Sequence, residues 1–378
     1  MRAFRNLGGG AVRLLYGVQG TGNGHLTRAR VMAPALKSAG IEVQYLFSSR
    51  PRERFFDMQG FGDWWWRKGL TFVTRNGRVS LPRTLTKAPD LAPFIRDVAD
   101  LDLESFDLVL TDFEPITAWA ARLRGKPLIG MGHQYAFHFP IPKSRGGLIA
   151  RMLMRGYAPA PTTLGLHWHS FGQPILPPLV EKPLAALPEP RTILVYLPFE
   201  SLATVRALLR RFPEYRFQVY CSAVKMPNQS GHIHYHPLSR RGFLKSLATC
   251  NGVLCNAGFE LISEALQAGK KILVKPLAGQ WEQRSNAKAL AELGWGESMT
   301  TLDADRVAAW LDKPVAIKVD YPDVAGEIAA WLKKGDWAVR PEWTQSTWDQ
   351  THWAKAEVPE EGENRFSENC SGLKAARH

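Results

Sequence analysis

Short apolar runs alternate with stretches of helical spacing along the first half of the chain. Residues 11–18 form an apolar run that predicts a strand, and the spacing of apolar residues in 26–39 predicts a helix that Gly40 ends. Later elements follow in the same order, with strands predicted at 41–47, 106–110 and 128–131 and helices at 90–103 and 144–157. This alternation is typical of a Rossmann-like domain with a parallel sheet.

The alternation resumes after a stretch rich in proline. Residues 172–190 hold six prolines without periodicity, which predicts a domain boundary. Beyond it, strands are predicted at 192–197, 217–221 and 233–236, and helices at 201–212 and 243–249. We therefore predict an α/β protein with two Rossmann-like, doubly wound domains that face each other across a cleft.

The predicted boundaries divide the chain into four parts. They are an N-terminal domain (1–175), a proline-rich linker (176–190), a C-terminal domain (191–334) and a tryptophan-containing segment with its tail (335–378). A chain of 378 residues with 45% hydrophobic content is long enough for two cores. From about residue 356 the sequence is polar and aperiodic, which predicts disorder.

Composition indicates where the protein works. No run approaches the roughly 20 apolar residues that span a bilayer, and the first ten residues lack the apolar region of a signal peptide. The four cysteines are scattered without a CxxC pair, which argues against a disulfide framework and a zinc site. We therefore expect a cytoplasmic protein.

Positive charge is concentrated in one part of the chain. The formal net charge is +13, and residues 115–180 contain no Asp or Glu. Residues 144–157 predict a helix with an apolar arc edged by Arg151 and Arg155, which is typical of a membrane surface, although the arc could equally face a core. No nucleic-acid motif accompanies the charge. An anionic membrane surface, at the inner face of the cytoplasmic membrane, is the partner we expect, and not nucleic acid.

A candidate anion site follows the predicted strand end at residues 253–254. Asn256 and Gly258 form a turn, and apolar residues at helical spacing come after it. The start of a helix offers free N–H groups and a positive dipole end, which suits a phosphate. Glu264 lies about one turn into this helix, where a carboxylate can accept hydrogen bonds from a ribose diol. Glu282 and Gln283 are expected on the loop after the next strand, at the same edge of the sheet.

This pattern resembles the donor-sugar signature of GT-B glycosyltransferases, both the bacterial lipid-linked N-acetylglucosaminyltransferase and the UDP-glycosyltransferase group. The signature has a Gly-rich turn, a Glu six residues after the Gly, and an acidic-Gln-x-x-Asn group. The residues that match in order and type are Gly258, Glu264, Glu282, Gln283 and Asn286. The resemblance implies that Glu282 and Gln283 hold the hydroxyls of the transferred sugar and that Asn286 braces the loop. Many members of the family carry a phosphate-binding His where this chain has Asn256.

A second glycine-rich loop follows the first predicted strand. Gly20, Gly22 and Gly24 alternate before His25, and such glycines permit positive φ and close approach of a ligand. The loop lacks the last glycine of a dinucleotide fingerprint, although Arg50 after the second strand leaves an NADP enzyme as an alternative. Followed by Arg28, the loop resembles the acceptor loop of GT-B enzymes, closest to a bacterial and archaeal branch of predicted glycosyltransferases. His133, at a later strand end, is the other candidate of this acceptor side.

The resemblance implies a catalytic pair, His25 and Asp112. In plant-type relatives a His on this loop pairs with an Asp farther along the domain, and these positions match that order. Inversion at the anomeric carbon needs a base for the acceptor hydroxyl, and an imidazole titrates near neutral pH. Asp112 would fix its tautomer. His133 and Glu114 are reserve candidates for the base, and His25 as a simple anion ligand is the alternative.

Two further patterns leave alternatives open. His232, His234 and His236 share one face of a predicted strand, but no carboxylate or Cys completes a zinc site, so no metal is expected. The run of three tryptophans at 64–66 cannot face one core, so at least one is expected on a surface, unless the run is a hydrophobic loop wrapping a helix.

The resemblance implies a glycosyltransferase that moves a sugar from a nucleotide sugar to a hydroxyl acceptor with inversion. A UDP-sugar is the commonest donor among the relatives, and the acceptor is expected to be a lipid or cell-envelope glycan. Enzymes of this fold need no metal, because a helix dipole and backbone donors stabilise the leaving diphosphate, and no cofactor is expected. The alternatives are a sugar-nucleotide 2-epimerase and a non-catalytic binder of nucleotides or polyanions.

Overall fold

A parallel sheet forms the centre of the N-terminal half of the protein. The computed structural model describes residues 11–70, 74–75, 78–79, 91–313 and 317–355, so the tail predicted to be disordered lies outside the described residues. The strand order is β3-β2-β1-β6-β7-β8, and all neighbours are parallel. The strands are β1 (Arg13–Gln19), β2 (Glu42–Ser48), β3 (Trp64–Trp66), β6 (Leu108–Asp112), β7 (Leu128–Gly132) and β8 (Thr162–Gly165).

Helices cover both faces of this sheet, which is why its strands are almost continuously apolar. The helices of this half are α1 (Asn23–Ser38), α3 (Leu91–Asp100), α4 (Pro115–Leu123), α5 (His133–Ala136) and α6 (Leu148–Tyr157), with single turns η1 (Arg52–Arg54) and η2 (Gln59–Phe61). A small hairpin pairs β4 (Thr74–Arg75) with β5 (Arg78–Val79). The strand order reverses between β1 and β6, and ligands of open α/β sheets bind at such a switch point.

The C-terminal half repeats the design. Its sheet has the order β11-β12-β10-β9-β13-β14-β15, parallel except for β11. The strands are β9 (Thr192–Tyr196), β10 (Arg216–Tyr220), β11 (Asn228–Ser230), β12 (Ile233–His236), β13 (Gly252–Cys255), β14 (Lys271–Val274) and β15 (Glu297–Ser298). The helices are α7 (Leu202–Leu209), α8 (Arg240–Thr249), α9 (Phe259–Gln267), α10 (Trp281–Glu292) and α11 (Ala304–Leu311). Two parallel-sheet units confirm the predicted fold class.

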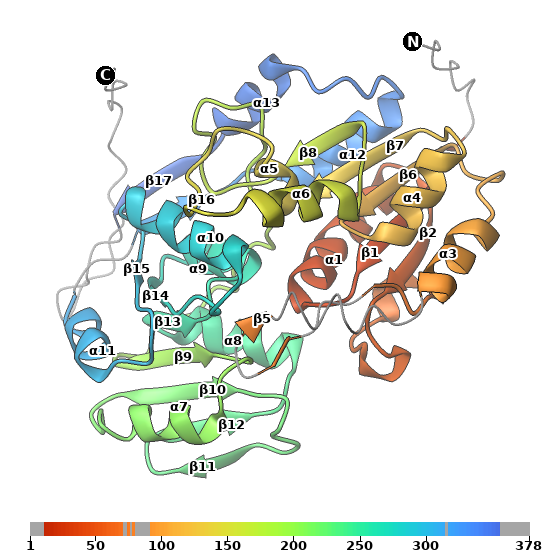
Figure 1. The fold of residues 1–378 in the computed structure, drawn as a ribbon. Helices are drawn as coiled ribbons and strands as arrows, with labels where there is room; N and C mark the ends of the chain where they lie inside the picture. Colours follow the sequence, from red (N-terminus) through yellow and green to blue (C-terminus); the bar gives the residue numbers. More distant parts are fainter. Residues whose placement is uncertain (1–10, 71–73, 76–77, 80–90, 314–316, 356–378) are drawn as a thin grey trace.

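The C-terminal elements return to the N-terminal half (Figure 1). Helix α12 (Val324–Lys334) packs against α1, and α13 (Pro341–Trp348) follows it. Trp348 donates from Nε1 to the Ile175 carbonyl at 2.7 Å, which ties α13 to the segment after β8. A short antiparallel pair, β16 (Ile317–Asp320) with β17 (His352–Lys355), is the last of the described elements. The segment from α12 to α13 therefore connects the C-terminal half back to the N-terminal half.

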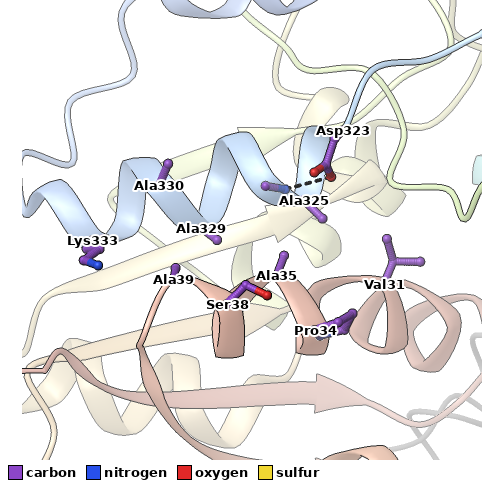
Figure 2. Close-up of a pocket in the computed structure, with 11 residues that line it drawn as sticks. Val31, Pro34, Ala35, Ser38, Ala39, Asp323, Ala325, Ala329, Ala330 and Lys333 are labelled. Carbon is purple, nitrogen blue, oxygen red and sulfur yellow. Dashed lines mark hydrogen bonds between the residues drawn. The ribbon is translucent and has the colours of Figure 1, made fainter.

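Figure 2 shows a surface groove of about 540 Å³ between α1 and α12. Small side chains such as Ala35 and Ala329 line it, which lets the two helices approach closely. Asp323 at one end caps α12 by accepting a hydrogen bond from the Gly326 N–H at 2.9 Å. None of the residues predicted to bind substrate lines this groove, so we assign it to helix packing.

Two local expectations from the sequence are wrong. The tryptophan run is not a loop but edge strand β3, in which Trp64 packs on Phe47 and Trp65 packs on Phe106, on opposite faces of the sheet. All three tryptophans are half-buried, in agreement with the prediction that they do not share one core. The segment with Glu282 is the start of helix α10 and not a loop, since Trp281 begins a buried helical face.

Candidate functional site

His25 and Asp112 meet at the switch point of the N-terminal sheet. His25 lies in the first turn of α1, and Asp112 is the last residue of the neighbouring strand β6. The His25 Nδ1 atom lies 2.7 Å from Asp112 Oδ1, and Asp112 is fully buried. A carboxylate only accepts hydrogen bonds, so this contact favours the tautomer with the proton on Nδ1 and the lone pair on Nε2. The pair predicted from the sequence is thus in contact.

Arg28 holds this pair from the next turn of α1. Its side chain is only 2% exposed, and its Nε donates to Asp112 Oδ2 at 2.7 Å. Its Nη2 also lies 2.9 Å from His25 Nδ1, which crowds the imidazole against the carboxylate. Burial alone would raise the pKa of Asp112, but the charge of Arg28 and the hydrogen bonds with Arg28 and His25 outweigh it and lower that pKa. Asp112 therefore stays ionised beside the imidazole.

Glu260 joins the cluster from the other half of the protein. It is the second residue of α9, and one carboxylate oxygen forms a close ion pair with Nη1 of Arg28. Burial raises its pKa to about 8, against the lowering effect of the Arg28 charge. Neither Glu260 nor the role of Arg28 was predicted from the sequence. The spacing of three residues between His25 and Arg28, which puts both on one helix face, is the signal that could have found Arg28.

Helix α9 begins in front of open space. Gly258 is its N-cap residue, and no side chain caps the helix start. A Cβ added to Gly258 would meet no atom within 4 Å. Asn256 donates from Nδ2 to the Lys275 carbonyl at 2.8 Å, so its amide joins the turn to the end of β14. The start of α9 therefore has no side-chain cap for its N–H groups, and the space beside Gly258 is open, which suits an anionic ligand.

Glu264 lies in the second turn of α9, about one turn from the helix start, as the sequence predicted. It is 7% exposed, and its Oε1 lies 2.7 Å from Nη2 of Arg240 at the start of α8. The same guanidinium lies 3.3 Å from Glu181. Glu264 therefore lies about one turn after the start of α9, and Arg240 orients its carboxylate.

The other predicted donor residues lie on α10. Gln283 accepts a hydrogen bond from the Leu277 N–H at 2.8 Å, and this bond holds the turn before the helix. Asn286 donates to the Ala257 carbonyl at 3.0 Å, next to Gly258. Glu282 is partly exposed and accepts hydrogen bonds from Gln134 of the N-terminal half. The structure therefore brings Asn286 to the turn before α9 and Glu282 to Gln134, while Gln283 holds the turn before α10.

The two reserve candidates for the base are occupied inside the protein. His133 has Nδ1 at 2.9 Å from the Leu166 carbonyl and Nε2 at 2.7 Å from Asn286 Oδ1, and its ring stacks on Phe259. Burial lowers its pKa. Glu114 caps α4 by accepting from two backbone N–H groups, and burial raises its pKa. His133 therefore braces the two halves, and Glu114 stabilises a helix.

The glycine-rich loop differs from its expected conformation. None of Gly20, Gly22 and Gly24 has a positive φ. A Cβ on Gly20 would lie 2.3 Å from the Ser48 carbonyl, so this glycine serves packing of the sheet, and a Cβ on Gly24 would lie 2.9 Å from Glu260. Only Gly22 faces open space. Gly20 and Gly24 therefore permit close packing of other protein segments against the loop, rather than the close approach of a ligand.

The alternating histidines make separate contacts. His232 Nε2 lies 3.0 Å from the Leu209 carbonyl, and His236 Nε2 lies 2.6 Å from Gln218 Oε1. Within the described ranges, no group of three His, Cys, Asp or Glu residues could hold a metal ion.

Several solved glycosyltransferase structures resemble this fold. LpCGTa in complex with UDP aligns with a TM-score of 0.55 and 14% identity, over 89% of this chain and 98% of its own. The spinosyn forosaminyltransferase SpnP aligns with a TM-score of 0.53 and 16% identity, over 87% and 95%. The glycotransferase of kitacinnamycin aligns with a TM-score of 0.55 and 14% identity, over 86% and 94%. These likenesses show a shared GT-B fold.

The sequence matches none of the curated proteins, but it does match a family model. A family model described as glycosyl transferase family 1 matches residues 12–314, which is most of the chain. The chain therefore belongs to glycosyl transferase family 1 and is a glycosyltransferase.

Proposed function

We propose that the protein transfers a sugar from a UDP-sugar to an acceptor hydroxyl with inversion, and that His25 is the base. The observation that carries this proposal is the His25–Asp112 pair, joined through Arg28 and Glu260 to the start of α9. His25 Nε2 takes the proton of the acceptor hydroxyl while its oxygen attacks the anomeric carbon. The bond to the diphosphate breaks, and UDP leaves with the electron pair. The α9 dipole stabilises the leaving charge without a metal or cofactor.

The donor is proposed to lie along α9 and α10. Gly258 leaves room for the diphosphate at the helix start, with Asn256 shaping the turn. Glu282 accepts hydrogen bonds from the transferred sugar, while Gln283 and Asn286 hold its helix in place. UDP as the nucleotide is supported by the resemblance of the motif and by the UDP complex of LpCGTa.

UDP release tests the proposed function. The protein is incubated with a panel of UDP-sugars, with and without a membrane extract that supplies acceptors. We expect UDP to appear only when both are present. Formation of a 2-epimer without acceptor would favour the epimerase, and binding without any turnover would favour the non-catalytic nucleotide binder.

The Glu264→Ala variant is expected to bind UDP about tenfold to a hundredfold more weakly. The reason is the loss of a charged acceptor for the ribose diol, which costs about 1.5–3 kcal/mol. Calorimetric titration with UDP measures the effect. Glu181→Ala is the matched control, because Glu181 contacts the same Arg240 but lies outside α9. Equal UDP affinity in Glu264→Ala and wild type would remove Glu264 from the donor site.

The acceptor is proposed to be a lipid or lipid-linked glycan at an anionic membrane surface. None of the helices in the described ranges has the length and apolar composition to cross a bilayer. On α6, Met152 is 66% and Leu153 43% exposed, and Arg151 and Arg155 are exposed beside them. The side chains of Leu148 and Ile149, the rest of the predicted apolar arc, lie outside the described residues. An apolar patch edged by arginines supports docking on anionic lipid.

Replacing Arg151 and Arg155 together by Gln is expected to weaken binding to phosphatidylserine vesicles roughly thirtyfold. Each cation contributes about 1 kcal/mol near such a surface. Flotation at low and high salt measures the effect. Leu187→Ser is the control, because Leu187 is also exposed but belongs to the linker. Flotation that ignores lipid charge and salt would contradict membrane docking and favour a soluble acidic acceptor.

A further inference from the structure

Gln134 connects the two halves at the centre of the candidate site. It is the second residue of α5, directly after β7, and it is 8% exposed. Its Nε2 lies 3.3 Å and 3.4 Å from the two carboxylate oxygens of Glu282 on α10. These distances are beyond the usual range for N–H···O bonds, so the contact is weak and a ligand hydroxyl can readily replace it.

The other end of the amide lies near Arg28 and Asp112. Gln134 Oε1 is buried and has no hydrogen-bond partner among the described residues. A Cβ on Gly132 would lie 3.2 Å from both Arg28 Nη2 and Asp112 Oδ1 and 3.3 Å from Gln134 Oε1, so these atoms surround one point. A buried acceptor without a partner is costly, and its presence in a native structure needs an explanation. A ligand hydroxyl would supply the missing donor.

The neighbouring glutamine on α10 is less suited to this role. Gln283 has its Oε1 bonded to the Leu277 N–H and is 5% exposed. Glu282 therefore faces an amide of the N-terminal half, and not its own neighbour in the motif. The Gln134 carbonyl oxygen and the Glu282 carboxylate can each accept a hydrogen bond from a hydroxyl group, and the Gln134 NH2 group can donate one.

We propose that Gln134 is a sugar-specificity residue, which binds the transferred sugar together with Glu282 and places it against His25. This proposal rests on the proposed function. Acceptors on both side chains favour a sugar with two neighbouring free hydroxyls over a deoxy sugar. The amide lies between Glu282 and the Asp112 cluster, so a sugar bound there has its reacting carbon near the base.

Calorimetric titration with UDP and with the UDP-sugar that wild type prefers tests the proposal without any acceptor. In Gln134→Met, which keeps the length of the side chain but removes its polar atoms, we expect UDP-sugar affinity to fall about tenfold and UDP affinity to stay within about twofold. Gln134→Glu, which places a second carboxylate against Glu282, is a second variant should the first not fold, and the same split is expected. Gln44→Ala is the control, because Gln44 is a half-buried glutamine of strand β2 that bonds backbone carbonyls.

The two variants separate this proposal from the proposed function. Equal losses for UDP and UDP-sugar, or no loss for either, would overturn the role of Gln134 while leaving the transferase proposal intact. A wild-type protein that binds no UDP-sugar would overturn both. A preference of wild type for a UDP-deoxysugar over its hydroxylated counterpart would overturn the assigned sugar class.

Discussion

The His25→Ala variant is expected to lose a factor of roughly 10²–10⁴ in kcat while its affinity for the donor stays nearly unchanged. His25 lies in the first turn of α1, where Asp112 holds Nδ1 at 2.7 Å and leaves Nε2 for the proposed role of base. Without the imidazole, the acceptor hydroxyl must lose its proton to water. The donor contacts on α9 and α10 do not involve His25, so donor binding should survive.

Two further variants complete that experiment. Asp112→Asn keeps the shape of the pair but lets the other tautomer form, so kcat should fall as well. His138→Ala, an exposed histidine on the segment after α5, should behave like wild type. If His25→Ala keeps wild-type kcat, or loses donor binding instead, His25 is an anion ligand and not the base.

Replacing Arg28 by Met is expected to destabilise the protein by about 3–5 kcal/mol, because breaking a buried ion pair leaves charge without compensation. Arg28 is the partner of both Asp112 and Glu260, and all three are buried. The free energy of unfolding in urea measures the loss.

The size of this effect depends on the two carboxylates. Adding Asp112→Asn to Arg28→Met should restore part of the stability, because Asp112, whose pKa is lowered, is the carboxylate left charged without its partner. Arg50→Met is the matched control, since Arg50 is also partly buried but contacts Asn23 and the ring of Phe55. An Arg28→Met variant no less stable than Arg50→Met would show that the cluster tolerates its charges.

The sequence predicted the architecture because the architecture depends on local patterns. Parallel strands covered on both faces need continuous apolar runs, such as the one that became β1. The meeting of His25 and Asp112 was predictable for a related reason. Each follows or ends a strand, and the carboxyl ends of neighbouring parallel strands lie at one edge of a sheet.

Contacts between the halves were not predictable from such patterns. Arg28 and Glu260 are 232 positions apart, and Gln134 and Glu282 are 148 apart, so no spacing rule relates them. The motif also suggested that Gln283 faces the sugar, but its Oε1 holds the turn before α10. Which polar residue faces the ligand is decided by the packing of two domains, which periodicity does not describe.

The stereochemistry of the product tests the account most directly. A proton NMR time course with an α-configured UDP-sugar and a competent acceptor follows the anomeric protons of donor and product. We predict that a β-linked product and UDP appear together and at equal rates, and only when acceptor is present. An α-linked product, or release of free sugar or of its 2-epimer without acceptor, would contradict single-step transfer with His25 as the base.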